Sequence, residues 1–512
     1  MRFRIGMWGG AALLACAVAS SAAAQTNESL VIDSIIIDNG NVFHARDGAP
    51  AFVSRLANTL HFRTRQWVIR RRLLLDKGDQ FDLARVEESE RALRALGVFR
   101  FVRVDSARPV HGGPLVLEVV TADGWSTQPQ ASYTTAGGDQ AWEIGVIERN
   151  LLGTATELAM TYGKNPDRRR LEFEFANPHF FSRRTLIQLR YSDFSDGRRG
   201  AWRFGLPFHE TGAPQSLETY GESTRGRELR FRDGALLDST EHRAFYVGLR
   251  GGIAVHATSR NYVRLWAGWE WRREDYAPRT TTPFPYSTFT TVRTGVELGQ
   301  VRFRVLEQFN SYARREDVDL SSTLRVGTVV ESGVGYEARG QVAAVWKRGF
   351  AVLRGEANGL DSSRVEGRLT VVSQNIRRHT LIAHLEGGRL HRPKFGSEFD
   401  PWQDQRGPRL FGVHDFTGTR MMWLALEDRI LLVEELWGLV GVGIAPFFDY
   451  GGAWYGDEAA RLGGNVGLAL RFGPTRAVRG EAAEIAFGYR FGDPLAVNGK
   501  RWAATLRKSV VF

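Results

Sequence analysis

From Trp125 to the carboxyl end, apolar and polar residues alternate along the chain, and clusters of Gly, Asn, Asp and Ser interrupt the alternation. Every second residue of Leu171 to Phe175 is apolar, and Val263 to Trp271 also places its charged residues opposite an apolar face. A period of two is the period of a β-strand, whose successive side chains point to opposite faces. The pattern predicts a long domain of antiparallel strands joined by turns.

The segment from Ser29 to Ala122 has a mixed pattern. The β-branched run Leu30 to Ile37 predicts a strand, and Thr64 is a candidate cap for a helix that carries Val68 and Leu73. A second helix is expected between Asp82, a favourable N-cap, and Gly97, which suits the position after the last turn. Two more strands are predicted at Phe99 to Asp105 and Leu115 to Val120, giving the order β-α-α-β-β.

The first residues have the pattern of a secretory signal. Arg2 and Arg4 precede an apolar stretch, and the small residues Ala22 and Ala24 suit a cleavage site. A lipoprotein-type site ending at Cys16, the sole cysteine, is the alternative. The expected division is a signal peptide at 1–24, a small periplasmic domain at 25–122 and a β-barrel at 123–512.

Alternation by itself fits either a soluble sandwich, whose polar face meets water, or a membrane barrel, whose apolar face meets lipid. Three features favour the barrel. Many segments are about ten residues long, as a tilted membrane strand requires, and the chain ends on a strand with Phe512 last. Tryptophans also stand near segment ends, at Trp142, Trp202, Trp269, Trp271, Trp454 and Trp502. At roughly 20 to 25 residues per strand and connection, the domain would hold about 16 strands.

The amino-acid composition limits the class of membrane protein and the kinds of partner that this chain can have. The mean hydropathy of −0.27 excludes a protein with many membrane-spanning helices. The formal net charge is +11, and for an exported chain this favours outer-membrane lipid, lipopolysaccharide or client polypeptides over nucleic acid.

The residues that could support catalysis do not form a recognisable site. Gly221 to Arg225 lacks the closing glycine of an esterase elbow, and no His-Glu-x-x-His motif occurs. His384 and His414 are interpreted as polar lining, and the acidic pair Glu427 and Asp428 as ion-pair partners. We therefore expect no enzyme, no cofactor and no metal.

The small domain resembles a POTRA domain. The resemblance rests on the run from Arg70 to Phe81, which contains Lys77-Gly78-Asp79, and on Leu93 to Phe99, which ends in Gly97-Val98-Phe99. The segment Phe43 to Arg63 is longer than the family's first connection and has room for an extra helix. The resemblance implies that an edge strand pairs with an extended client, and this edge is assigned to Phe99, Phe101, Val102 and Val104.

The barrel resembles the BamA/TamA superfamily, in which POTRA domains precede a 16-stranded outer-membrane barrel with a surface-antigen-like carboxyl-terminal part. Asn150-Leu151-Leu152-Gly153 and Asn177-Pro178 match the family's first hairpins, and Phe448-Asp449-Tyr450-Gly451 its Phe-x-Asp-x-Gly strand. The carboxyl-terminal recognition signal and the last seam strand are assigned to Trp502, Leu506, Val510 and Phe512.

The family's inner loop, which folds into the lumen with an Arg-Gly-Phe/Tyr tip, corresponds to residues between Arg406 and Arg429. Here Arg409, Phe411, Gly412 and Gly418 form the motif, and Phe411 stands where the family has its arginine. That arginine pairs with carboxylates of the inner wall, so Asp449 needs another partner, and Arg409 and Arg429 are the candidates. The expected luminal partners are Glu427, Arg429, Asp449 and Gly451.

The resemblance implies insertion or translocation of client polypeptides, through a lateral seam between the first and last barrel strands. A periplasmic or inner-membrane partner would bind through the POTRA domain. A secretion porin for one dedicated protein and a passive diffusion barrel are the alternatives.

Overall fold

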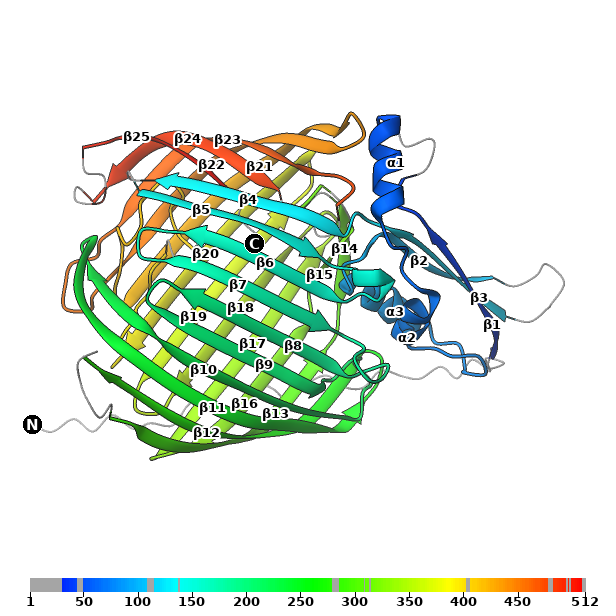
Figure 1. The fold of residues 1–512 in the computed structure, drawn as a ribbon, viewed down its shortest axis with the longest axis horizontal. Coiled ribbons are helices and arrows are strands. Elements are labelled where there is room, and N and C mark those ends of the chain that lie inside the picture. Colours follow the sequence, from blue (N-terminus) through cyan, green and yellow to red (C-terminus); the bar gives the residue numbers. More distant parts are fainter. Residues whose placement is uncertain are drawn as a thin grey trace, which may run out of the picture.

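The structure is a computed structural model that describes residues 30–508, apart from 44–48, 108–114, 137–138, 279–284, 308, 313–314, 402–405, 478–481, 494–495 and 497–498. It consists of a large β-barrel with a small α/β domain at one end (Figure 1). The predicted signal peptide, Cys16, Val510 and Phe512 lie outside the described residues.

The small domain contains three strands and three helices. They are β1 (Ile32–Gly40), α1 (Ala51–Leu60), α2 (Gln66–Arg72), α3 (Leu83–Ala95), β2 (Phe99–Ala107) and β3 (Leu115–Asp123). The sheet has the order β1-β3-β2, with β1 parallel and β2 antiparallel to β3. A core that includes Ile69, Leu93 and Leu117 holds α2 and α3 against it. No helix in the described residues has the length and apolar character needed to cross a membrane.

Of the two predicted helix caps, Asp82 was confirmed and Thr64 was not. Asp82 accepts a hydrogen bond from the Ala84 backbone N–H and begins α3 as expected, and Gly97 adopts a φ of +67° after it. The prediction for Thr64 was wrong, because α2 begins after Arg65 without a side-chain cap. The Thr64 N–H donates instead to Asp123 at 2.7 Å, and this bond ties the start of α2 to the end of β3.

The barrel is closed by 20 antiparallel strands of the described chain. These are β4 (Thr127–Ala136), β5 (Asp139–Glu148), β6 (Glu157–Lys164), β7 (Arg169–Asn177), β8 (Leu186–Phe194), β9 (Gly197–Leu206), β10 (Gln215–Arg232), β11 (Ala235–Ala257), β12 (Asn261–Ala277), β13 (Ser287–Gln300), β16 (Ser322–Val330), β17 (Val334–Trp346), β18 (Gly349–Gly359), β19 (Ser363–Ser373), β20 (His379–His391), β21 (Arg420–Leu436), β22 (Val440–Trp454), β23 (Gly463–Pro474), β24 (Ala483–Gly492) and β25 (Trp502–Lys508). A single-turn 3-10 helix, Leu151–Gly153, follows β5. β25 lies beside β4 and closes the barrel.

The predicted count of about 16 strands was therefore wrong. Several hairpins join their strands through only two or three residues, at 195–196, 233–234, 331–333, 347–348 and 360–362. Such short turns leave fewer residues per strand and connection than the estimate assumed. The same chain length therefore forms four more wall strands than predicted.

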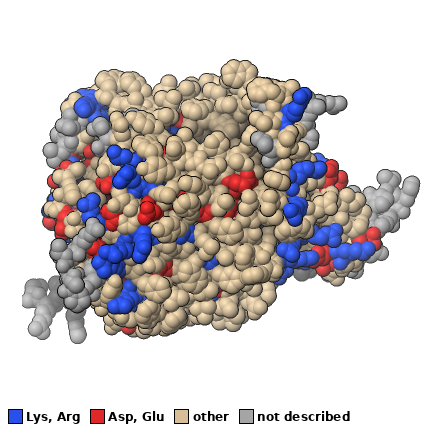
Figure 2. Space-filling model, viewed as in Figure 1, with Lys and Arg blue, Asp and Glu red and all other residues tan. Residues whose placement is uncertain are grey.

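The wall has an apolar outer face and a charged inner face. On β12, Leu265 and Trp269 point outward with about 43% of their surface exposed, whereas Arg264 and Glu270 point inward and are buried. In Figure 2, charged side chains gather toward the two ends of the molecule, and other residues occupy most of the wall between them. This arrangement is the reverse of a soluble sandwich and suits a surface surrounded by lipid.

A separate hairpin between β13 and β16 lies against the inside of the wall. It consists of β14 (Phe303–Glu307) and β15 (Arg315–Asp319), which pair only with each other among the described strands. Leu306, Phe309 and Leu320 form one apolar cluster with the inward-facing residues Phe350, Val352, Val372 and Ile382 of β18, β19 and β20. The hairpin therefore fills part of the lumen at the end that carries the small domain.

Candidate functional site: the inner loop and the closing strands

The connection between β20 and β21, residues 392–419, folds into the lumen as the resemblance implies. Its tip carries Arg409, whose Nε donates to Asp449 Oδ2 at 2.8 Å. Arg409 Nη2 donates to Glu427 Oε2 at 2.8 Å, and Glu484 Oε1 lies 3.5 Å from Nη1. All four side chains have no exposed surface. Of the two candidate partners for Asp449, Arg409 is thus the one that pairs with it.

Two further arginines connect this cluster to other parts of the molecule. Arg429 Nε donates to Glu427 at 2.6 Å, and its Nη1 donates to the carbonyl of Phe309 in the luminal hairpin at 2.7 Å. Arg507 Nε, on the last strand, donates to Glu484 at 2.9 Å. The ion-pair cluster therefore joins the inner loop, the luminal hairpin and a closing strand.

The loop tip rests on a part of the wall made of small residues. Leu410 has no exposed surface and packs with Ala445, Ala469 and Ala486. Phe411 also contacts the wall closely, because a Cβ added at Gly463 would lie 2.6 Å from its ring. Phe411, where the resemblance implies an arginine, thus acts as an apolar anchor, and Arg409 two residues earlier supplies the charge.

The predicted glycines fit places where a side chain has no room. A Cβ at Gly418 would lie 2.1 Å from the Trp454 backbone carbon, and one at Gly451 would lie 2.2 Å from the Met422 carbonyl oxygen. The Gly412 N–H donates to Asp415 Oδ2 at 2.5 Å and closes the tip. Gly418 and Gly451 therefore allow the loop base and the strands β21 and β22 to approach closely.

His414 holds the loop to the opposite side of the barrel. Its Nε2 lies 3.1 Å from Asp167 of the β6–β7 turn, its Nδ1 bonds to Asp400, and its ring stacks on Phe231 with centroids 3.4 Å apart. Burial lowers the pKa of His414, but the bonds to the two carboxylates and their charges outweigh it and raise the pKa to about 9. From the sequence, His414 was interpreted as polar lining of the lumen, because its partner Asp167 lies 247 residues away along the chain and no local pattern connects the two.

We expect the docking of this loop to depend on pH. Because the folded pKa of about 9 lies above the value of about 6.5 in an unfolded chain, the contribution of His414 is complete below about pH 6.5 and is lost as the pH rises through 9. Amide hydrogen exchange across 406–416 should therefore speed up between pH 7 and 10 beyond its intrinsic increase. His414→Gln should remove this excess, and an unchanged profile in the variant would contradict the assignment.

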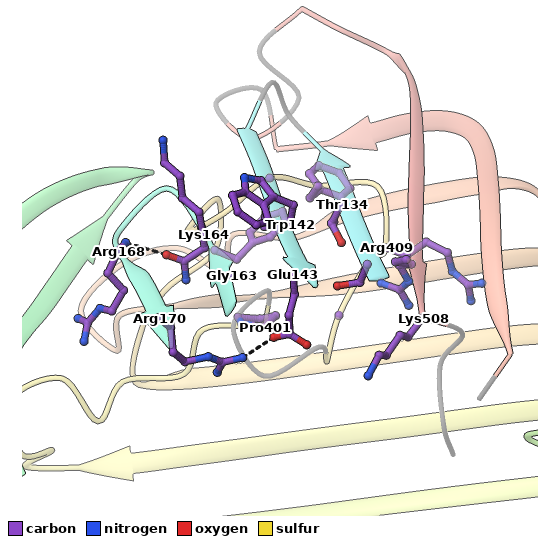
Figure 3. A pocket seen from close by; sticks show the side chains of 18 of the residues that line it. Thr134, Trp142, Glu143, Gly163, Lys164, Arg168, Arg170, Pro401, Arg409 and Lys508 are labelled. Carbon is purple, nitrogen blue, oxygen red and sulfur yellow. Dashed lines mark hydrogen bonds and ion pairs between the residues drawn. The ribbon is translucent and has the colours of Figure 1, made fainter. Parts of the chain in front are cut away.

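A cavity of about 470 Å³ lies behind the closing strands, on the luminal side (Figure 3). Ser132 and Thr134 of β4, Arg507 and Lys508 of β25, and Phe411 of the loop tip are among its lining residues. Further along its wall, Arg170 pairs with Glu143 at 2.5 Å. The two strands that close the barrel thus face a polar cavity with the inner loop beside it.

The predicted client edge is an edge strand, because β2 pairs only with β3 in the described sheet. Its side chains Phe99, Val102 and Val104 are buried in the domain core, while Phe101 is half-buried. Only the backbone of β2 is thus available to a further strand. On β25, Trp502 is 64% exposed on the outer face and Leu506 is half-buried.

The small domain is held to the barrel by contacts that the sequence did not indicate. Arg94 of α3 donates through Nε and Nη2 to both carboxylate oxygens of Asp317 in the luminal hairpin, each at 2.7 Å. Glu88 accepts two bonds from Thr211 in the β9–β10 turn. The family-like turn after β5 contributes too, since the Gly153 carbonyl accepts the Arg65 N–H at 2.9 Å. The domain is therefore fixed at this end of the barrel.

Gly153→Ala is expected to loosen this docking. Gly153 has a φ of +75°, and an added Cβ would lie 2.3 Å from the Arg63 carbonyl oxygen. Gly234 is a matched control, with a φ of +78° but no atom near an added Cβ. Both alanines should cost about 1–2 kcal/mol in backbone strain, but only Gly153→Ala should increase tryptic cleavage at Arg63 and Arg65. Equal cleavage in the two variants would refute the expectation.

The described residues contain no group of three or more His, Cys, Asp or Glu side chains arranged to hold a metal ion. Charged residues of the lumen, such as Arg409, Glu427 and Arg429, pair with one another.

No family model matches the chain. Among curated proteins, it is 24% identical over 225 residues to the outer membrane protein assembly factor BamA of Neisseria meningitidis serogroup B (strain ATCC BAA-335 / MC58), a match covering 43% of this chain and 26% of that protein. The matched region thus spans about a quarter of the relative's length.

Solved structures with a similar chain include the following three. BamA from Haemophilus ducreyi lacking POTRA domains 1–3 is 11% identical, with a TM-score of 0.39 and coverage of 94% of this chain and 85% of that one. CdiB from Acinetobacter baumannii is 10% identical, with a TM-score of 0.46 and coverage of 94% and 74%. CdiB from Escherichia coli is 11% identical, with a TM-score of 0.44 and coverage of 97% and 93%.

Proposed function

Because this chain resembles the outer-membrane barrels of the BamA/TamA superfamily, we propose that it lies in an outer membrane and inserts or secretes client polypeptides there. The small domain would be a periplasmic POTRA-like domain that offers the free backbone edge of β2 to an extended client. Its unfolded clients and the surrounding lipid and lipopolysaccharide are the proposed partners, and the proposed activity needs no catalytic group.

The observation that carries this proposal is the cavity behind the closing strands. β4 and β25 line part of it with polar and charged side chains, so on the luminal side part of their junction borders open space. Where a strand pair borders a cavity, less side-chain packing opposes its separation. An opened edge in lipid leaves backbone groups unpaired, and an incoming client strand relieves that cost.

Locking this junction tests the proposal. Ala131 of β4 and Ala504 of β25 both point outward, whereas Thr505 points inward and would be unsuitable. We would introduce cysteines at Ala131 and Ala504, on these neighbouring strands, in a Cys16→Ser background and join them with bismaleimides of graded spacer length. The locked protein should fail to restore the outer-membrane proteins or secreted partner lost on depletion, whereas each single-cysteine variant should restore them. Full restoration by the locked protein would refute the seam.

A passive diffusion barrel is the second candidate, because the lumen also holds a cavity of about 910 Å³. Its lining runs from Phe208, at the end that carries the small domain, to Asp361 and Lys394 at the opposite end. Steady open-channel conductance in planar bilayers, together with no change in other outer-membrane proteins on depletion, would favour this function over the first.

A further inference from the structure

Helix α1 presents large apolar side chains away from the protein. Its inner side is fixed, because Ala57 is buried and the Asn58 side chain accepts the Phe43 N–H and donates to the Phe43 carbonyl. On its outer side, Phe52 is 73% exposed and Leu56 is 53% exposed. Residues four apart lie on the same helix face, so these two side chains form one apolar ridge with no partner in the described chain.

The helix lies along the rim of the barrel, beside the closing strands. At one end, Val42, Phe43 and Ala57 pack with Leu439 of the β21–β22 turn. The segment that follows the helix binds the β5–β6 turn, where Asn150 donates to the Phe62 carbonyl at 3.2 Å. In the order of the wall, the strands β23, β24, β25 and β4 lie between these two turns. Figure 1 shows α1 at the right-hand rim with its axis across the direction of the strands.

Several turns of the rim at this end expose large apolar side chains beside basic ones such as Arg183 and Arg377. The apolar ring is formed by Leu152, Phe180, Phe181, Ile376 and Trp437. Aromatic and large apolar residues at the ends of membrane strands mark the boundary between hydrocarbon and headgroups. The exposed ridge of α1 continues this ring, and Phe62, directly after the helix, is 59% exposed as well.

Basic side chains stand beside the apolar ridge. Arg55 of α1 and Arg63 and Arg65 of the following segment are exposed, and α1 has no acidic residue. A helix with an apolar face flanked by arginines suits the interface of a bilayer that contains anionic lipids. A soluble protein partner would not account for the continuity of the ridge with the apolar ring and with the lipid-facing wall.

We infer that α1 is a membrane-surface helix, which inserts Phe52 and Leu56 into the periplasmic leaflet next to the closing strands while Arg55, and Arg63 and Arg65 after the helix, bind anionic phospholipid headgroups. The inference rests on the outer-membrane placement proposed above and adds a lipid-binding surface to the small domain. The insertion depth expected for such a helix is about 5–10 Å below the headgroup boundary. The helix would hold the domain at the membrane and disturb lipid packing where a client strand enters.

Single labelled cysteines test this contact in the full chain. In a Cys16→Ser background, Phe52→Cys and Leu56→Cys would each carry an environment-sensitive fluorophore, and the protein would be inserted into vesicles of phosphatidylethanolamine and phosphatidylglycerol. Asp105→Cys is the control, because Asp105 is exposed on β2 and lies opposite Glu118 in the strand register, away from the end of β3 that leads into the barrel. Nitroxide-labelled lipids should quench labels 52 and 56 severalfold more than label 105, and aqueous iodide should show the reverse order.

Two outcomes would overturn the inference, and they differ in what they say about the proposed function. If labels 52 and 56 were as open to iodide as label 105 in a protein that has inserted, the inference alone would fail. If the protein did not insert into vesicles at all, judged by unchanged migration of unboiled and boiled samples, both proposals would fail. As a second variant, Arg55→Glu should weaken quenching of label 56 in anionic vesicles without changing heat-modifiable migration.

Discussion

Arg409→Met is expected to destabilise the barrel by about 3–5 kcal/mol, the usual cost of leaving a buried charge without its partner. In this variant Glu427 would remain paired with Arg429, and Glu484 would remain paired with Arg507. Asp449, which has no exposed surface, would keep only neutral donors, namely the backbone N–H of residue 409 at 3.2 Å and the Asn465 amide at 3.1 Å. The loss should appear as a lower urea midpoint for heat-modifiable migration in detergent or lipid.

The double variant Arg409→Met with Asp449→Asn separates charge from packing. Because it removes both ends of the pair, it should recover part of the lost stability. Arg315→Met is the matched control, since its pair with Glu307 is exposed and should contribute less than about 1 kcal/mol. If Arg409→Met also destabilised the barrel by less than about 1 kcal/mol, Arg409 would not be the charge that holds the loop.

Removing the luminal hairpin, residues 303–319, in favour of a short Gly-Ser linker should open the barrel at the end that carries the small domain. The deletion uncovers Phe350, Val352 and Ile382 on the inner wall and removes the Phe309 carbonyl from Arg429. Single-channel conductance in planar bilayers should rise severalfold. Thermal stability should fall as well, because each uncovered large side chain loses about 1.5–3 kcal/mol of burial.

Asp317→Asn is the control for the ion pair between the hairpin and Arg94 of the small domain, which the deletion also removes. This change weakens the contact with Arg94 but leaves the apolar packing of the hairpin intact. Conductance should therefore stay near that of the unmodified protein. If the deletion left conductance unchanged, the hairpin would not be what obstructs the lumen.

Local patterns in the sequence were enough to predict the strands and their faces. The outward Leu265 and Trp269 and the inward Arg264 and Glu270 of β12 follow directly from alternation. The number of strands did not follow, because it depends on turn length, and a two-residue connection such as Lys347-Arg348 contains no Gly, Asn or Asp that would mark a turn.

Contacts between distant segments could not be read from the sequence. Arg409 and Arg429 were equal candidates for Asp449, and the fold separates them, because Arg429 shares the inner face of β21 with Glu427 and bonds to it. The luminal hairpin was not predicted, because the local pattern of Phe303 to Glu307 is that of an ordinary short strand. Nothing in that pattern indicates that the strand pairs with β15 inside the lumen and not with a strand of the wall. The Arg94–Asp317 contact joins residues 223 positions apart.

The connections of the inner loop also constrain the order in which the barrel forms. The carboxylates that bind Arg409 belong to β21, β22 and β24, which follow the loop closely in sequence. The contact of His414 with Asp167 spans 247 residues. Because short loops close at lower entropic cost than long ones, the carboxyl-terminal sheet should fold around the loop tip first. The amino-terminal strands would then be captured through Asp167, and the loop tip would serve as a folding nucleus.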